Sequence, residues 1–212
     1  MLAVMLLGCV DPTTAPNAPL VGETGELDDT GLPDPEDTAS EPTEPGTAPD
    51  DRHLPPIPSA GCGSSEVRGG AARERSMTSR GARRTWWEQV PGAHDGVTPV
   101  PLVLDLHGTL ETANGQRWLS GLDEVAREEG WVIAWPESQN VAGLKMWDIT
   151  CNNADLDFLD ALIDQLDAEL CIDRRRLFVT GLSNGGYATH LATGALRPEI
   201  AAGAAIAGGV GR

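Results

Sequence analysis

The segment Gly-Leu-Ser-Asn-Gly at residues 181–185 has the spacing of a serine nucleophile on a sharp turn between a strand and a helix. Residues 177–180 are β-branched and aromatic, which favours a buried strand, and residues 186–192 have the composition of a helix opening. The outer glycines suit a strained turn that neighbouring backbone approaches closely. The pentapeptide alone also fits a tight turn with a surface serine. The strand–turn–helix context favours Ser183 as a catalytic nucleophile.

A second motif lies upstream, where a near-continuous apolar run at residues 100–106 ends in His107 and Gly108. Runs of this kind suit a parallel strand that is covered by helices on both faces. A turn at the carboxyl end of such a strand can supply a backbone N–H that stabilises negative charge on a carbonyl oxygen. We expect the His107 side chain to brace this loop rather than to take part in proton transfer.

Further motifs are spread over about 150 residues. They are Ser-Ala-Gly-Cys-Gly at 59–63, Leu-His-Gly at 106–108, Trp147, Cys151, Asp-Leu-Asp-Phe-Leu at 155–159, Cys-Ile-Asp at 171–173, Arg176 and Thr-Gly-Leu-Ser-Asn-Gly-Gly at 180–186. In these motifs the chain from Cys62 onwards resembles the secreted esterase family of feruloyl esterases and polyhydroxybutyrate depolymerases. One departure is Ala154, where the family usually has the first of two adjacent aspartates. The resemblance implies an α/β-hydrolase fold, with a mainly parallel sheet flanked by helices.

The resemblance also implies roles for particular residues. Ser183 would attack an ester carbonyl, and the N–H groups of Thr109 and Asn184 would form the oxyanion hole. Trp147 lies in a loop at the sheet edge where ligands bind, so it either stacks on the substrate or packs on its own scaffold. No metal or organic cofactor is implied.

The general base is harder to place. In this fold the catalytic residues follow the order Ser, Asp or Glu, His, which excludes His107 because it precedes Ser183. After Ser183 the sequence contains one histidine, His190, and one acid, Glu199. His190 lies about 10 Å further along the same predicted helix, beyond hydrogen-bonding reach of the serine. We therefore expect an N-terminal fragment of a longer esterase that is inactive by itself; a degenerate hydrolase is the alternative.

The four cysteines fit an oxidising compartment. The resemblance implies a disulfide between Cys151 and Cys171, which flank a predicted helix, and this leaves Cys62 without a partner if Cys9 carries a lipid. Reduced, buried cysteines are the alternative. A metal site is not indicated, because the sequence has no Cys-x-x-Cys pair and no cluster of histidines.

Composition separates the chain into parts. The net charge is −17, and between residues 10 and 60 twelve Asp and Glu against one Arg give a local charge of −11. The same stretch holds eleven of the sixteen prolines, so we interpret residues 9–60 as a disordered acidic linker and residues 61–212 as the esterase domain. No basic stripe is present, which argues against nucleic acid as a partner.

The first nine residues are apolar but too few to span a bilayer, which takes about 20. Leu-Leu-Gly-Cys at residues 6–9 resembles a bacterial lipobox, in which the cysteine is lipidated, so residues 1–8 are interpreted as a truncated signal segment. The basic start of a signal peptide is missing, so either the natural start codon lies further upstream or the apolar run is a chance N-terminus. We expect a lipid anchor at Cys9 and a cell-surface location, with plain secretion or a cytosolic chain as alternatives.

The elements that would position these residues alternate between strand and helix, which predicts a parallel sheet. Strands are predicted at 84–90, 100–106, 131–135, 177–180 and 201–209, the last of them buried; helices are predicted at 119–129, 155–170 and 186–192. The acids at 155, 157 and 160 are expected to lie on a solvated helix face. Together with these elements, the family resemblance implies a monomeric serine esterase that acts on feruloyl-polysaccharide esters, or secondly on polyesters. A non-catalytic binding module is the rival interpretation.

Overall fold

The computed structural model describes residues 54–64, 69–151, 153–196 and 200–209. The chain divides into two units, and the helices and strands described below all belong to the unit that contains Pro56–Arg212. Residues 1–53, and with them the predicted signal segment, Cys9 and most of the predicted linker, lie outside the described residues. Among the described residues, no helix is both long and apolar enough to cross a bilayer.

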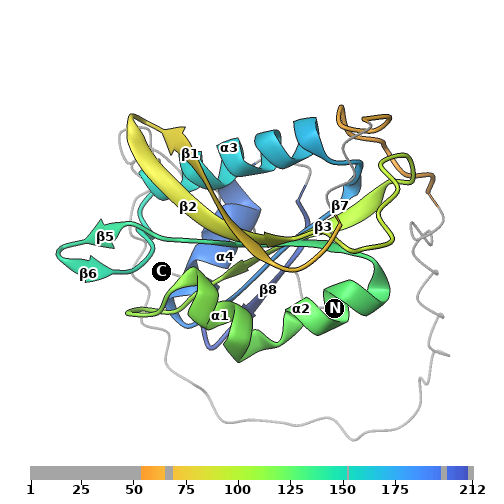
Figure 1. Cartoon of the computed structure of the whole chain (residues 1–212). Coiled ribbons are helices and arrows are strands. Elements are labelled where there is room, and N and C mark those ends of the chain that lie inside the picture. Colours follow the sequence, from red (N-terminus) through yellow and green to blue (C-terminus); the bar gives the residue numbers. More distant parts are fainter. Residues whose placement is uncertain (1–53, 65–68, 152, 197–199, 210–212) are drawn as a thin grey trace, which may run out of the picture. The chain divides into compact units, whose positions relative to one another are not determined.

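A six-stranded sheet forms the centre of the unit, in the spatial order β1-β2-β4-β3-β7-β8 (Figure 1). The strands are β1 (Arg73–Ser79), β2 (Ala82–Gln89), β3 (Val100–Leu106), β4 (Val132–Pro136), β7 (Ile172–Leu182) and β8 (Ile200–Ile206). β4, β3, β7 and β8 are parallel to one another. β2 pairs antiparallel with β4 on one side and with β1 on the other. The mainly parallel sheet predicted from the sequence is confirmed.

Helices cover both faces of this sheet. They are α1 (Ala113–Ser120), α2 (Leu122–Glu129), α3 (Ala154–Glu169) and α4 (Asn184–Ala195); a small hairpin of β5 (Asn140–Val141) and β6 (Leu144–Lys145) lies between β4 and α3. Successive side chains of β3 point to opposite faces. Leu102 and Leu104 pack in the cluster that contains residues of α3 and α4, and Val103 packs with Ala113 of α1 and Ala126 of α2.

Two predicted elements differ from the structure. The predicted helix 119–129 is two helices, because Gly121 adopts a left-handed conformation (φ 62°) that ends α1 and begins α2. The strand predicted at 201–209 is β8, but most of its residues are exposed rather than buried. Within the described part of the chain β8 pairs with β7 alone, which leaves it at the edge of the sheet.

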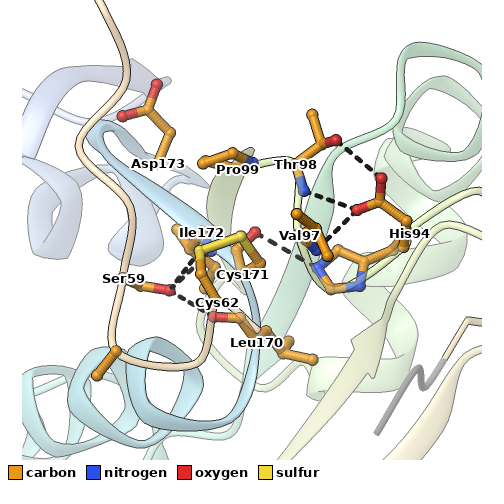
Figure 2. The surroundings of a disulfide bond; sticks show 12 residues. Ser59, Cys62, His94, Val97, Thr98, Pro99, Leu170, Cys171, Ile172 and Asp173 are labelled. Atoms are coloured by element: carbon orange, nitrogen blue, oxygen red, sulfur yellow. Dashed lines mark hydrogen bonds between the residues drawn. A yellow bond between two sulfur atoms is a disulfide. The ribbon is translucent and has the colours of Figure 1, made fainter. Parts of the chain in front are cut away.

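The folded unit begins earlier than the predicted domain boundary at residue 61. Pro58 forms a bridge with Asp173 at the start of β7, and the buried Ser59 hydroxyl donates to Leu170 O (2.5 Å) and accepts from Ile172 N–H (2.9 Å) (Figure 2). A Cβ on Gly61 would lie 2.4 Å from Leu170 N, so this close approach requires glycine. Residues 56–60 therefore pack on the domain although the sequence placed them in the linker.

The structure also corrects the predicted disulfide. Cys171 is joined to Cys62, with the two Cα atoms 4.1 Å apart, and not to Cys151 (Figure 2). Cys151 and Cys171 lie at opposite ends of α3, which has 16 residues and is therefore about 24 Å long. A disulfide tolerates a Cα separation of only about 7 Å, so a pairing across the length of this helix is ruled out.

Candidate active site

The predicted nucleophile lies at the junction of β7 and α4. β7 ends at Leu182, α4 begins at Asn184, and the exposed Ser183 between them has φ 53° and ψ −115°. Non-glycine residues seldom adopt such a conformation, and it persists only where the surroundings enforce it. The Ser183 N–H donates to Ile206 O (2.8 Å), which fixes the turn against the end of β8. The strand–turn–helix arrangement predicted around Ser183 is confirmed.

The glycines on either side of Ser183 allow the turn to pack closely. A Cβ on Gly181 would lie 2.5 Å from Gly185 O, and a Cβ on Gly185 would lie 2.2 Å from Leu106 O. Both neighbours are backbone atoms, which cannot swing away as a side chain can. The two glycines are therefore needed for the turn to lie directly against the end of β3.

The loop after β3 lies beside the serine. A Cβ on Gly108 would be 3.8 Å from Ser183 Cβ, and the exposed Thr109 follows directly. The Gly108 N–H donates to Glu111 Oε2 (3.0 Å), and the Glu111 N–H donates to Gly108 O (3.3 Å). No motif in the sequence marks Glu111, although its carboxylate binds the backbone of this loop. The structure thus brings the segment predicted to contain an oxyanion donor next to Ser183.

His107 braces this loop, as predicted. The fully buried ring has its Nδ1 2.7 Å from Gly108 O, and its Nε2 accepts from Ser138 N–H (3.0 Å). The Gly108 carbonyl needs a donor and the Ser138 N–H needs an acceptor. The proton of the neutral His107 ring therefore resides on Nδ1. Burial lowers the pKa of His107 despite its hydrogen bond to Gly108. The ring is therefore neutral at pH 7, and both nitrogens are occupied within the fold.

No other described histidine can serve Ser183. His190 is exposed on α4, seven residues along the helix from the serine. His94 is buried beside Cys171, where its Nε2 lies 3.4 Å from the carbonyl before β7, away from the carboxyl end that holds Ser183 (Figure 2). Glu199, the acid that follows Ser183, lies outside the described residues. The described residues also contain no cluster of three or more potential metal ligands.

Trp147 does not have the substrate-stacking role predicted for it. Its side chain has no exposed surface, and its ring centroid lies 5.3 Å from that of His107. The indole Nε1–H donates to His107 O (2.9 Å), and the Trp147 N–H donates to Asn184 Oδ1 (2.6 Å). A buried ring cannot stack on a substrate. The alternative prediction, that Trp147 packs within the protein, is therefore the correct one.

Asp155 was predicted to be solvated and is instead buried in an ion pair. Arg84 Nη2 donates to Asp155 Oδ1 (2.6 Å), and both side chains are at most 4% exposed. Burial lowers the pKa of Arg84 even though Asp155 opposes the shift. Asp155 Oδ2 also accepts the Asp148 N–H (2.9 Å), so the pair holds the loop that contains Trp147. Because Arg84 lies 71 residues from Asp155 in sequence, the residues around Asp155 do not predict its burial.

The sheet topology together with the serine on the β7–α4 turn defines an α/β-hydrolase. No family model matches the chain. Solved structures of other proteins share the fold, and two of them serve as examples. A structure described as a thermostable esterase is 24% identical, with a TM-score of 0.51, and the match covers 65% of this chain and 41% of that one. The structure titled "sOPH native" is 21% identical, with a TM-score of 0.54, over 69% of this chain and 54% of that one.

Curated proteins related by sequence define the relationship more closely. A bifunctional acetylxylan esterase/xylanase from Neocallimastix patriciarum is 33% identical over 48% of this chain and 15% of its own length. A probable feruloyl esterase C from Aspergillus niger is 29% identical over 60% and 47%. A poly(3-hydroxyalkanoate) depolymerase C from Paucimonas lemoignei is 33% identical over 51% and 28%. The predicted resemblance to feruloyl esterases and polyester depolymerases is confirmed, and the chain spans less than half the length of these relatives.

Proposed function

We propose that the protein is a serine carboxylic ester hydrolase. The conformation of Ser183 carries this proposal: an exposed hydroxyl is held at φ 53° on a strand–helix turn that only glycines at 181 and 185 allow. Strain of this kind persists at functional sites because it presents a reactive group. The relatives named as acetylxylan esterase, feruloyl esterase and polyester depolymerase support the same chemistry.

In the proposed mechanism Ser183 Oγ attacks the ester carbonyl while a histidine accepts its proton. The N–H groups of Thr109 and Asn184 stabilise the oxyanion, and the histidine then protonates the departing alcohol. Water activated by the same histidine hydrolyses the acyl-enzyme. We propose that this histidine and its aspartate partner lie beyond Arg212, which accords with the partial coverage of the relatives. The mechanism calls for no cofactor, and we propose that the chain of 212 residues is inactive without these groups.

We place feruloyl esters on plant polysaccharide first as substrate and a short-chain polyester second. The names of the relatives cover both classes of polymer-linked ester. Such substrates are too large to enter a cell, which favours an extracellular enzyme, and we propose that the enzyme is a monomer.

The function is tested by the substitution Ser183→Ala in the full-length protein. We expect it to lower hydrolysis of a nitrophenyl ester at least ~10³-fold, as removal of a triad member does elsewhere. Near-wild-type turnover by the variant would overturn the assignment. The non-catalytic alternative makes a different prediction: a binding module would show no ester hydrolysis in the wild type, and the sequence beyond Arg212 would lack an Asp and a His on late loops.

We further propose that a lipid on Cys9 holds the enzyme on the outside of a bacterial membrane, with the acidic, proline-rich stretch as a spacer. Several acyl chains anchor stably, because each buried CH₂ contributes about 0.8 kcal/mol. When the full-length protein is expressed in a bacterial host, it should fractionate with membranes and incorporate labelled palmitate, and Cys9→Ala should release it. Wild-type protein found in the medium with an N-terminus beyond Cys9 would replace anchoring by plain secretion.

A further inference from the structure

We infer that Trp147 is a positioning residue that fixes the separation of the two oxyanion-hole donors, the N–H groups of Thr109 and Asn184. This inference rests on the proposed function, because it gives Trp147 a role at the same site. The two donors belong to different segments: Thr109 to the loop after β3, and Asn184 to the first turn of α4. Trp147, on the loop between β6 and α3, is bonded to both segments.

The attachment to α4 consists of two hydrogen bonds in opposite directions. The Trp147 N–H donates to Asn184 Oδ1 (2.6 Å), and Asn184 Nδ2 donates to Trp147 O (3.3 Å). Asn184 is the first residue of α4, so its own backbone N–H has no acceptor within the helix and is available to a ligand. Because the Asn184 side chain is occupied by Trp147, the pair of bonds fixes the orientation of the residue whose N–H would meet the oxyanion.

The attachment to the β3 loop passes through the indole ring. Trp147 Nε1–H donates to His107 O (2.9 Å), and His107 Nδ1–H donates in turn to Gly108 O (2.7 Å). In a trans peptide the C=O and the following N–H point in opposite directions. With the Gly108 carbonyl turned toward the buried His107 ring, the Thr109 N–H points away from that ring. The indole therefore acts on Thr109 through His107 and Gly108.

The loop that contains Trp147 is itself held in place. Asp155 of α3, buried against Arg84, accepts the N–H of Asp148, the residue after Trp147. Loss of the indole N–H would leave the His107 carbonyl without its side-chain donor in a fully buried position, and an unpaired buried group costs about 1–3 kcal/mol. Trp147 thus links the two donors, with its backbone bonded to Asn184 and its indole bonded to His107, rather than only filling space.

This role predicts a specific kinetic effect. Oxyanion donors act on charge that develops only in the transition state, so their misplacement lowers kcat and leaves KM largely unchanged. Removal of one donor costs about 10²–10³-fold in kcat, and a displacement of about 1 Å can cost ~10²-fold. Trp147→Phe keeps most of the ring and removes only the N–H, so we expect kcat to fall about tenfold to a hundredfold.

Trp135 supplies a matched control. It is equally buried, and its Nε1–H donates to a buried acceptor, Asp105 Oδ2 (3.0 Å), outside the site. The experiment compares kcat and KM of full-length Trp147→Phe and Trp135→Phe on a nitrophenyl ester, together with the affinity of a boronic acid that mimics the transition state. We expect Trp147→Phe to lose boronate affinity in proportion to kcat/KM, and Trp135→Phe to keep kcat within about threefold.

A double-mutant cycle supplies the decisive step. Asn184→Ala removes the side chain that holds Trp147 and keeps the backbone donor, so it should also lower kcat, and the double variant should be no slower than the worse single variant. Asn184→Ala gives the same test if Trp147→Phe does not fold. Equal kcat for Trp147→Phe and Trp135→Phe, a change confined to KM, or additive effects would each overturn the inference. A folded wild type without ester hydrolysis would instead refute the proposed function, and the inference with it.

Discussion

At the scale of single residues, Gly185 shows how a missing side chain lets the nucleophile turn lie against β3. A Cβ at this position would be 2.2 Å from Leu106 O and 2.6 Å from His107 O. Because both atoms belong to the backbone, relief would require the end of β3 to move away from α4. We expect Gly185→Ala to lower the free energy of unfolding by about 3 kcal/mol or more, at the upper end of overpacking effects, as measured by urea denaturation.

Gly194 is the matched control, because it lies in the same helix and a Cβ there would meet nothing within 4 Å. Glycine inside a helix costs roughly 1 kcal/mol relative to alanine. Gly194→Ala should therefore raise the free energy of unfolding by about 0.5–1 kcal/mol. If Gly185→Ala proved as stable as Gly194→Ala, the close packing of the turn on β3 would be refuted.

At the scale of elements, the sequence was sufficient wherever one periodicity extended over a whole element. The apolar run at 100–106 is β3 with the predicted bounds, and the leucines at 156, 159, 162 and 166 repeat at helical spacing along α3. β1 was not predicted, because its buried and exposed positions do not alternate in apolar and polar residue types. Gly121 could equally be an interior glycine of one helix, and only its left-handed backbone separates α1 from α2.

The site shows the same division between local and distant information. Ser183 and the bracing role of His107 follow from neighbouring residues, which specify a turn and a strand end. The burial of Trp147 and Asp155 depends on Asn184 and Arg84, which lie 37 and 71 residues away in sequence. Polar side chains are buried where a partner satisfies them, and a single sequence does not identify that partner.

At the scale of the whole folded unit, the Cys62–Cys171 disulfide joins the N-terminal segment to the start of β7. Its two cysteines are 109 residues apart in sequence, so the bond closes a loop that contains β1 to β6 and α1 to α3. Near the bond, Asp173 accepts hydrogen bonds from the N–H groups of Ile57 (2.9 Å) and Arg175 (3.0 Å). Burial alone would raise the pKa of Asp173, but these bonds and the Arg176 side chain together hold it below its usual value.

The disulfide should contribute a large share of the stability of the unit. Closing a loop of 109 residues reduces the entropy of the unfolded chain, which corresponds to roughly 4–5 kcal/mol. We expect Cys62→Ala, Cys171→Ala and the double variant to lose similar amounts in urea denaturation, because breaking the bond at either end removes the same constraint. A map of peptides under non-reducing conditions should link the peptide of Cys62 to that of Cys171. A link between Cys151 and Cys171, or double-variant stability equal to that of the wild type, would contradict this pairing, and with it the view that the N-terminal segment is fastened to β7.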